Sequence, residues 1–202
     1  MNLFSKTIVG LDIGTSSVKL VEMKNVNGRW RLMALGTSDI PRESLEAKNP
    51  DQQRSVLVET IKKTYEKSGI KSKKVATSLL GEAVIIRYVK MPFMTEEELR
   101  KSISKEAEQH IPLGMDQVVL DFQILGEGQE DGQRKIDVLL VAAKIDVVDQ
   151  HIATLKAAGL SSAVIDVDAF AAQNAYEVNR LEANEETVAL INVGATWTTI
   201  NI

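Results

Sequence analysis

Apolar runs separated by polar turns dominate the first part of the chain. Three such runs predict a meander of strands, and they cover Thr7–Leu11, Val18–Met23 and Arg29–Leu35. The Asn27-Gly28 pair before the third run is a strong signal for a tight turn. A helix is predicted over Pro50–Ser68, with an Asn-Pro start and Gly69 at its end, and Val75–Leu80 is the next strand. This order of elements is typical of an α/β layer.

The pattern changes from Val84 onward. A β-branched run, Val84–Ile86, leads into a charged helix that opens with a capping box at Thr95 and is expected to end before Pro112. Two strands follow on either side of a polar, glycine-rich segment, Gly126–Gly132, which is expected to be a loop; they are Val118–Leu125 and Ile136–Ala143. A helix between Asp146 and Gly159 completes the unit. Residues 84–158 are therefore interpreted as an insertion.

The α/β pattern resumes after the insertion. Strand Ala163–Val167, helix Ala169–Arg180 and strand Val188–Val193 are predicted, with a polar break at 182–186. The segment Val188–Thr196 repeats the pattern of Thr7–Thr15: an apolar strand, a short polar side chain, an apolar residue, glycine and a hydroxyl. Such a repeat predicts two related lobes. We expect the chain to be the first part of a longer protein, with its second lobe only begun.

Composition excludes several classes of protein. The 202 residues are 44% hydrophobic with a net charge of -4, and no basic stripe indicates a nucleic acid partner. Cysteine is absent, which excludes disulfides and thiolate zinc sites. The two histidines, His110 and His151, show no metal-ligand spacing and are expected to be ordinary helix residues. No apolar run approaches the roughly twenty residues of a membrane span, so direct membrane insertion is not expected. We expect a cytoplasmic location.

The two repeated turns carry the chemistry. A glycine after a strand lets the backbone approach a phosphate closely, and Gly14 and Gly194 hold that position. Asp12, if it lies beside a phosphate, needs a cation between them, such as magnesium held partly through water, and Lys19 supplies a positive charge. In a simpler interpretation the turns are polar hairpins whose hydroxyls only satisfy their own N–H groups. The repetition favours the phosphate interpretation.

The segment Gly10–Lys19 resembles the first phosphate motif of the actin, Hsp70 and sugar-kinase superfamily. More narrowly, the chain is similar to the PilM family of type IV pilus assembly proteins. Four further segments carry this likeness along most of the chain: Met91-Pro92, Glu106–Pro112, Val138–Lys144 and Asp166–Asn174.

The resemblance implies a particular α/β architecture. Residues 1–83 and 159–180 would form an actin-like, ribonuclease-H-like subdomain. Residues 84–158 would form an inserted α+β subdomain of the FtsA type, SHS2-like, and residues 187–202 would begin the truncated second lobe.

The resemblance also implies a site for ATP and Mg²⁺. Asp12 would face the magnesium. The phosphates would meet two sets of residues, Gly14, Thr15, Ser16, Ser17 and Lys19 from the first turn and Gly194, Ala195 and Thr196 from the second.

Asp168 would position the attacking water, with Asp166 as the weaker alternative, although Asp168 is equally suited to be a helix N-cap. Asn192 replaces the aspartate of magnesium-binding relatives, and the adenosine motif is missing. We therefore expect at most weak hydrolysis, and weak ATP binding or none by this chain alone.

Partners follow from the same resemblance. The cytoplasmic N-terminal tail of PilN would dock as an extended segment in a groove between the main and inserted subdomains, and other inner-membrane pilus platform or motor proteins are expected. Self-association through the last hairpin is also expected. Two alternatives remain open from the sequence: an FtsA-like filament or membrane tether of cell division, and a metabolic kinase of the same superfamily.

Overall fold

A computed structural model describes residues 7–42, 49–180 and 187–202, and it divides the chain into two compact units. Unit 1 comprises Met1–Leu80 with His151–Ile202, and unit 2 comprises Gly81–Gln150. The second boundary therefore lies earlier than the predicted end of the insertion at residue 158. The reason is packing, because Leu155 and Ala158 belong to the hydrophobic core of unit 1. The predicted polar break at 182–186 lies outside the described residues.

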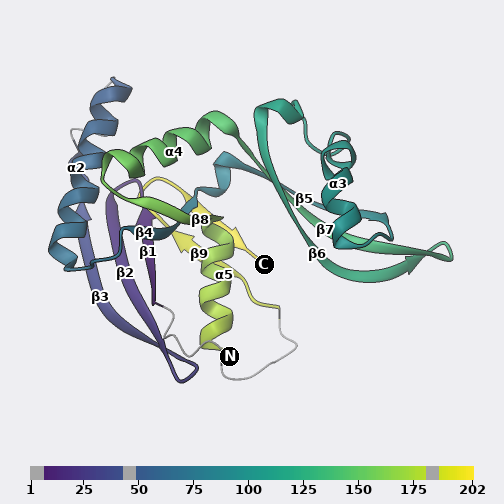
Figure 1. Ribbon diagram of the computed structural model, residues 1–202, viewed down its shortest axis with the longest axis horizontal. Coiled ribbons are helices and arrows are strands. Elements are labelled where there is room, and N and C mark those ends of the chain that lie inside the picture. Colours follow the sequence, from purple (N-terminus) through teal and green to yellow (C-terminus); the bar gives the residue numbers. More distant parts are fainter. Residues whose placement is uncertain (1–6, 43–48, 181–186) are drawn as a thin grey trace. The chain divides into compact units, whose positions relative to one another are not determined.

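Unit 1 is built on a five-stranded mixed sheet in the order β3-β2-β1-β4-β8 (Figure 1). The strands are β1 (Thr7–Ile13), β2 (Ser17–Val26), β3 (Arg29–Asp39), β4 (Lys74–Leu79) and β8 (Ser161–Val167). The first three form the predicted antiparallel meander, and β4 and β8 add to it in parallel. β2 and β3 run further than predicted. Pairing continues to Val26 and Arg29 because Asn27 and Gly28 adopt positive φ angles of 53° and 81°, as a tight hairpin turn requires.

One face of this sheet forms the core of unit 1. Alternate apolar residues of β1, β2 and β4 are buried there together with residues of two helices, α2 (Pro50–Ser68) and α4 (Ile145–Ala157). The side chain of Asn49 caps α2 by accepting from the N–H of Asp51 at 2.9 Å, and Gly69 ends the helix with a φ of 71°. Residues that alternate with the core positions, Asp12 and Lys19 among them, therefore lie on the other face of the sheet.

A helix and a hairpin follow β8 in unit 1. Helix α5 (Asp168–Asn179) follows β8, and the hairpin of β9 (Leu190–Val193) and β10 (Thr198–Asn201) forms a two-stranded sheet of its own. The hairpin contacts α5 through Asn201, whose side-chain amide donates to the Ala169 carbonyl at 3.4 Å and to Gln173 Oε1 at 3.2 Å. Within the described residues, no helix is long and apolar enough to cross a membrane.

Unit 2 is a three-stranded antiparallel sheet in the order β5-β7-β6. Its strands are β5 (Val84–Pro92), β6 (Val118–Glu130) and β7 (Gln133–Lys144), and single 3-10 turns cover Gly81–Ala83 and Met115–Gln117. The prediction of a loop over residues 126–132 is wrong. β6 and β7 continue past a bulge after Ile124, and the turn consists of Asp131 and Gly132 with φ angles of 51° and 73°. An Asp-Gly pair suits such a hairpin turn, so the signal was present in the sequence.

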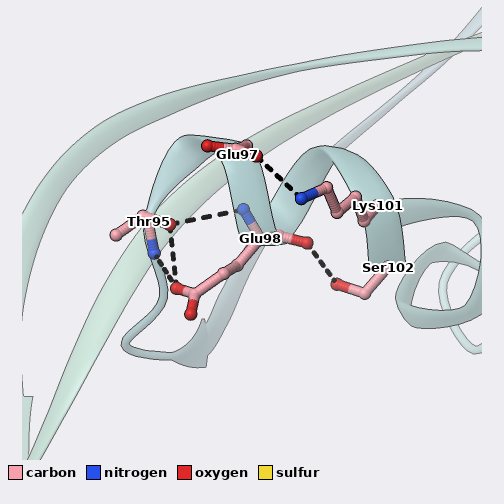
Figure 2. Close-up of polar contacts among 5 residues, drawn as sticks. All are labelled: Thr95, Glu97, Glu98, Lys101 and Ser102. Carbon is pink, nitrogen blue, oxygen red and sulfur yellow. Dashed lines mark hydrogen bonds and ion pairs between the residues drawn. The ribbon is translucent and has the colours of Figure 1, made fainter.

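Helix α3 (Glu96–Ala107) covers one face of the unit 2 sheet with its apolar stripe, Leu99, Ile103 and Ala107. Figure 2 shows the predicted capping box at its start. The Thr95 hydroxyl accepts from the N–H of Glu98, while the Glu98 carboxylate accepts from the N–H of Thr95 at 2.8 Å. The helix ends five residues before Pro112 because the N–H groups of His110 and Ile111 both turn back to the Ala107 carbonyl. His110 therefore lies in a turn and not in a helix.

Candidate functional site: two hairpin turns

The first turn joins β1 to β2 and is closed by its own backbone. The N–H of Gly14 donates to the carbonyl of Ser17 at 3.0 Å, and the carbonyl of Ser16 accepts from the N–H of Ile40 at 2.8 Å. A Cβ added at Gly14 would lie 3.1 Å from the Ser17 carbonyl oxygen, which is tighter than an ordinary contact. The predicted phosphate residues Gly14, Thr15 and Ser16 thus form the turn itself, and Ser17 begins β2.

The second turn has the same construction. The N–H of Gly194 donates to the carbonyl of Trp197 at 2.9 Å, which closes a turn that also contains Ala195 and Thr196. A Cβ at Gly194 would lie 2.9 Å from the Trp197 carbonyl oxygen, so this position needs glycine for space. The likeness of the two segments in sequence is therefore a likeness in geometry.

The two turns meet. The hydroxyl of Thr196 donates to the hydroxyl of Thr15, with 3.1 Å between the two oxygen atoms. These residues are 181 positions apart in the chain, so the contact exists only in the folded protein. It brings the two glycine turns to one place.

An ion pair lies beside the first turn. Asp12 and Lys19 are cross-strand partners in β1 and β2, and Lys19 Nζ is 2.8 Å from Asp12 Oδ2. Both side chains are about half exposed, at 56% and 54%, so the pair adds little to stability. It does place a carboxylate and an ammonium beside the turn, since a Cβ at Gly14 would lie 3.9 Å from Lys19 Nζ.

The two aspartates near the start of α5 line different cavities. Asp166 lies in β8 opposite Ser78 of β4 and lines a cavity of about 470 Å³ together with Asp12 and Lys19. Asp168 lines a smaller one of about 200 Å³ together with Asn192. The structure thus groups Asp166, and not Asp168, with the ion pair beside the first turn.

Asp168 is the first residue of α5, and Val167 holds the N-cap position, so the interpretation of Asp168 as the N-cap is wrong by one residue. Its carboxylate nevertheless accepts from the N–H of Ala169 at 2.8 Å.

Two residues that the sequence did not indicate support the arrangement. Asn201 ties the open end of the β9–β10 hairpin to α5, and Ser78 lines the larger cavity between Asp12 and Asp166. Neither belongs to a recognisable motif. Their positions depend on strand pairing and on contacts between distant parts of the chain, which no local pattern encodes.

The residues present suit a magnesium ion whose ligands include waters and phosphate oxygens. They do not suit a metal ion whose ligands are all protein side chains. Among the described residues, no cluster of three or more His, Asp or Glu side chains could hold a metal ion. Magnesium commonly keeps several waters and binds through one or two carboxylates plus phosphate oxygens. Asp12, exposed at the edge of the turn, fits that role. His151 has another partner: its Nε2 lies 3.2 Å from the Thr77 hydroxyl, and burial lowers its pKa.

Comparisons with known proteins identify the family. The family model of the type IV pilus assembly protein PilM matches residues 10–202. The chain belongs to this family. The resemblance to the PilM family that was predicted from segments such as Gly10–Lys19 and Asp166–Asn174 is confirmed. Membership of this family favours a pilus assembly protein over a cell-division tether or a metabolic kinase.

Two solved structures share the fold. A PilM-PilN type IV pilus biogenesis complex is 30% identical with a TM-score of 0.80, and the match covers 96% of this chain and 56% of that one. The cytoplasmic domain of EpsL, an inner membrane component of the type II secretion system of Vibrio cholerae, is 15% identical with a TM-score of 0.52, over 82% of this chain and 59% of that one. The predicted actin-like α/β fold class is confirmed. The chain spans little more than half the length of these relatives.

Proposed function

We propose that this chain acts in type IV pilus assembly as a cytoplasmic scaffold that binds ATP and docks the N-terminal tail of PilN. The observation that carries the proposal is the match over 96% of the chain to a structure described as a PilM-PilN complex. Family membership supports the same role. Binding, and not turnover, is the expected contribution of the chain, because Asp168 already uses its carboxylate on the start of α5 and Asn192 stands where magnesium-binding relatives have aspartate.

The convergence of the two turns supports the ATP part of the proposal. Gly14, where a Cβ would be tightly placed, and Gly194, where a Cβ has no room, bring backbone close to the same region, next to the hydroxyls of Thr15 and Thr196. Lys19 supplies a cation for the phosphates, and Asp12 supplies a carboxylate for magnesium, directly or through water. Magnesium, when bound, would offset the charge of the phosphates, and Asp12 would help to hold it.

Replacement of Lys19 tests the ATP site. We expect MgATP to bind this chain weakly, and Lys19→Ala or Asp12→Ala to lower its affinity about tenfold, since each removes a charge-assisted interaction. NMR titration that follows the amide signals of Gly14 and Gly194 measures both affinity and place. Lys24→Ala, further along β2, is the matched control and should leave the affinity unchanged. Equal affinities in all variants, or shifts confined to other residues, would reduce the turns to structural hairpins.

Unit 2 presents a surface suited to an extended peptide. Its sheet has two edge strands, β5 and β6. Exposed apolar side chains include Tyr88, on the face away from α3, and Leu125, at the bulge of β6. These two residues line a cavity of about 360 Å³ beside Lys90 and Asp137. Edge strands offer main-chain pairing and such hollows receive alternate side chains, which is how added strands are recognised. We propose that this face contributes to binding of the PilN tail.

Fluorescence anisotropy with a labelled peptide copying the cytoplasmic N-terminus of PilN tests this docking. Leu125→Ala should weaken binding about tenfold if the side chain is buried by the peptide. Leu32→Ala is the matched control, because Leu32 is a similarly exposed leucine of unit 1. If both variants bind like the parent, the sheet face of unit 2 is not the site. If the parent chain itself does not bind the peptide, the proposed docking by this chain is wrong.

A further inference from the structure

The contact between Thr15 and Thr196 lies at one end of the β9–β10 hairpin. The opposite end is tied to α5 by the amide of Asn201. Because the two ends are held separately, the turn end can move away from the first turn while the Asn201 end stays in place. The hydroxyl pair is thus suited to opening, since a single hydrogen bond between neutral, solvent-accessible groups is weak.

Groups proposed to bind phosphate already have protein partners in this arrangement. The Thr196 hydroxyl donates to Thr15, and the Lys19 ammonium is paired with Asp12. The N–H groups of Gly14 and Gly194 donate within their own turns. The one O–H of Thr196 is already donated to Thr15, so a phosphate chain that accepts from both hydroxyls has to break the hydroxyl pair. Lys19 still has N–H donors besides the one that it gives to Asp12.

We propose that the Thr15–Thr196 pair is a latch that holds the two turns closed, and that a phosphate chain binds by separating them and accepting from both hydroxyls. This inference rests on the proposed phosphate binding and adds its regulation. Hydrogen bonds from hydroxyls to a charged phosphate are stronger than the bond between two neutral hydroxyls, so the exchange favours the ligand. Lys19 can donate to the phosphate as well as to Asp12, and Asp12 would be the residue that holds magnesium.

A disulfide between the turns tests the latch directly. The chain has no cysteine, so the double variant Thr15→Cys/Thr196→Cys contains a single thiol pair. With 3.1 Å between the native oxygens, the two sulfurs can approach bonding distance with small adjustments. Its matched control is Ser16→Cys/Thr196→Cys, in which the first thiol lies one residue along the same turn. Under a glutathione buffer we expect the first pair to close about tenfold faster than the control, because proximity sets the rate. Equal rates would overturn the latch.

The same variant then tests whether closure opposes the ligand. We expect the reduced form to bind MgATP and the oxidised form to bind it about tenfold more weakly, with dithiothreitol restoring the affinity, because locked turns cannot separate. Magnesium tripolyphosphate in place of MgATP shows whether the phosphate chain alone is the ligand or the nucleoside is needed. Amide NMR shifts of Gly14 and Gly194 report binding in both forms.

The outcomes separate the latch from the function on which it rests. If the reduced form binds and the oxidised form binds equally well, the latch is wrong while the phosphate site stands. If the reduced form binds neither MgATP nor tripolyphosphate, and Lys19→Ala likewise changes nothing in the parent chain, the proposed phosphate site is wrong and the latch falls with it.

Discussion

Among the polar side chains of this protein, Glu98 has a well-defined structural role at the start of α3. Its pKa is lowered first by the backbone N–H of Thr95 and then by the Thr95 hydroxyl, while desolvation opposes them and Lys101 adds a small favourable charge. Figure 2 shows the carboxylate turned back onto Thr95. The ionised form of Glu98 is therefore the form that caps α3.

The stability of unit 2 should depend on pH through this carboxylate. Because the folded pKa lies below the unfolded value of 4.5, the contribution is present above that pH and is lost as pH falls through the folded pKa. Glu98→Gln should therefore destabilise the protein at neutral pH, and the difference from the parent should shrink as the pH falls below 4.5 through the folded pKa. Urea unfolding at several pH values measures it. Glu106→Gln, on the same helix but outside the cap, is the control, and a constant difference for Glu98→Gln would contradict the assignment.

At the scale of elements, close approach between a strand and a helix decides the packing of unit 1. Gly36 of β3 lies against α2, and a Cβ added there would be 2.8 Å from Ser68 Cβ and 2.9 Å from the Thr64 carbonyl oxygen. Thr64 is fully buried in the helix. A backbone atom and a short side chain cannot move aside as a flexible side chain can. This glycine therefore sets the distance between β3 and α2.

Gly36→Ala should lower the free energy of unfolding by about 2 kcal/mol, since the added methyl forces β3 and α2 apart. Gly128→Ala in β6 is the matched control, because a Cβ there would meet nothing within 4 Å. The control should change stability by well under about 1 kcal/mol. Chemical unfolding of the two variants provides the comparison, and similar losses in both would show that crowding against α2 is not the cause.

At the scale of the whole molecule, two units each have a core of their own, while the β9–β10 hairpin leaves apolar side chains exposed. Ile191 and Ile200 are cross-strand partners on one face and are 62% and 61% exposed, with Val193 at 76% on the same face. Trp197, at the turn, is 54% exposed. Apolar patches of this kind are typical of interaction surfaces. The hairpin also has two free edges within its own sheet.

We therefore expect the 202-residue chain to self-associate through this hairpin at tens of micromolar concentration. Ile191→Lys/Ile200→Lys places charges on the exposed face without altering the turn, and it should shift the chain toward monomer. A chain that ends at Arg180 should be monomeric too. Light scattering coupled to size exclusion distinguishes the forms. If the parent chain is monomeric and neither change alters its mass, the hairpin face is not an association surface.

Much of the architecture could be predicted from short stretches of the sequence. The bounds of α2 match the prediction because the Asn-Pro start and Gly69 act on neighbouring backbone groups. The hairpin turn at Asn27-Gly28 and the capping box at Thr95 are likewise set by residues within four positions of each other. Even the paired turns were visible, because the same short pattern occurs twice.

Contacts between distant residues were decided only by folding. The Thr15–Thr196 pair and the Asn201 tie join segments that no local pattern connects. Unit 2 ends earlier than predicted because Leu155 packs in the core of unit 1. The sequence of its helix, α4, does not indicate in which unit Leu155 packs. The residues of the glycine-rich segment have a low propensity for strands, which predicted a loop. β6 and β7 nevertheless extend through it, because their backbone groups pair with each other. Local signals thus determined most helices and strands of this protein. The packing of these elements against one another determined the candidate site, in which the two glycine turns meet.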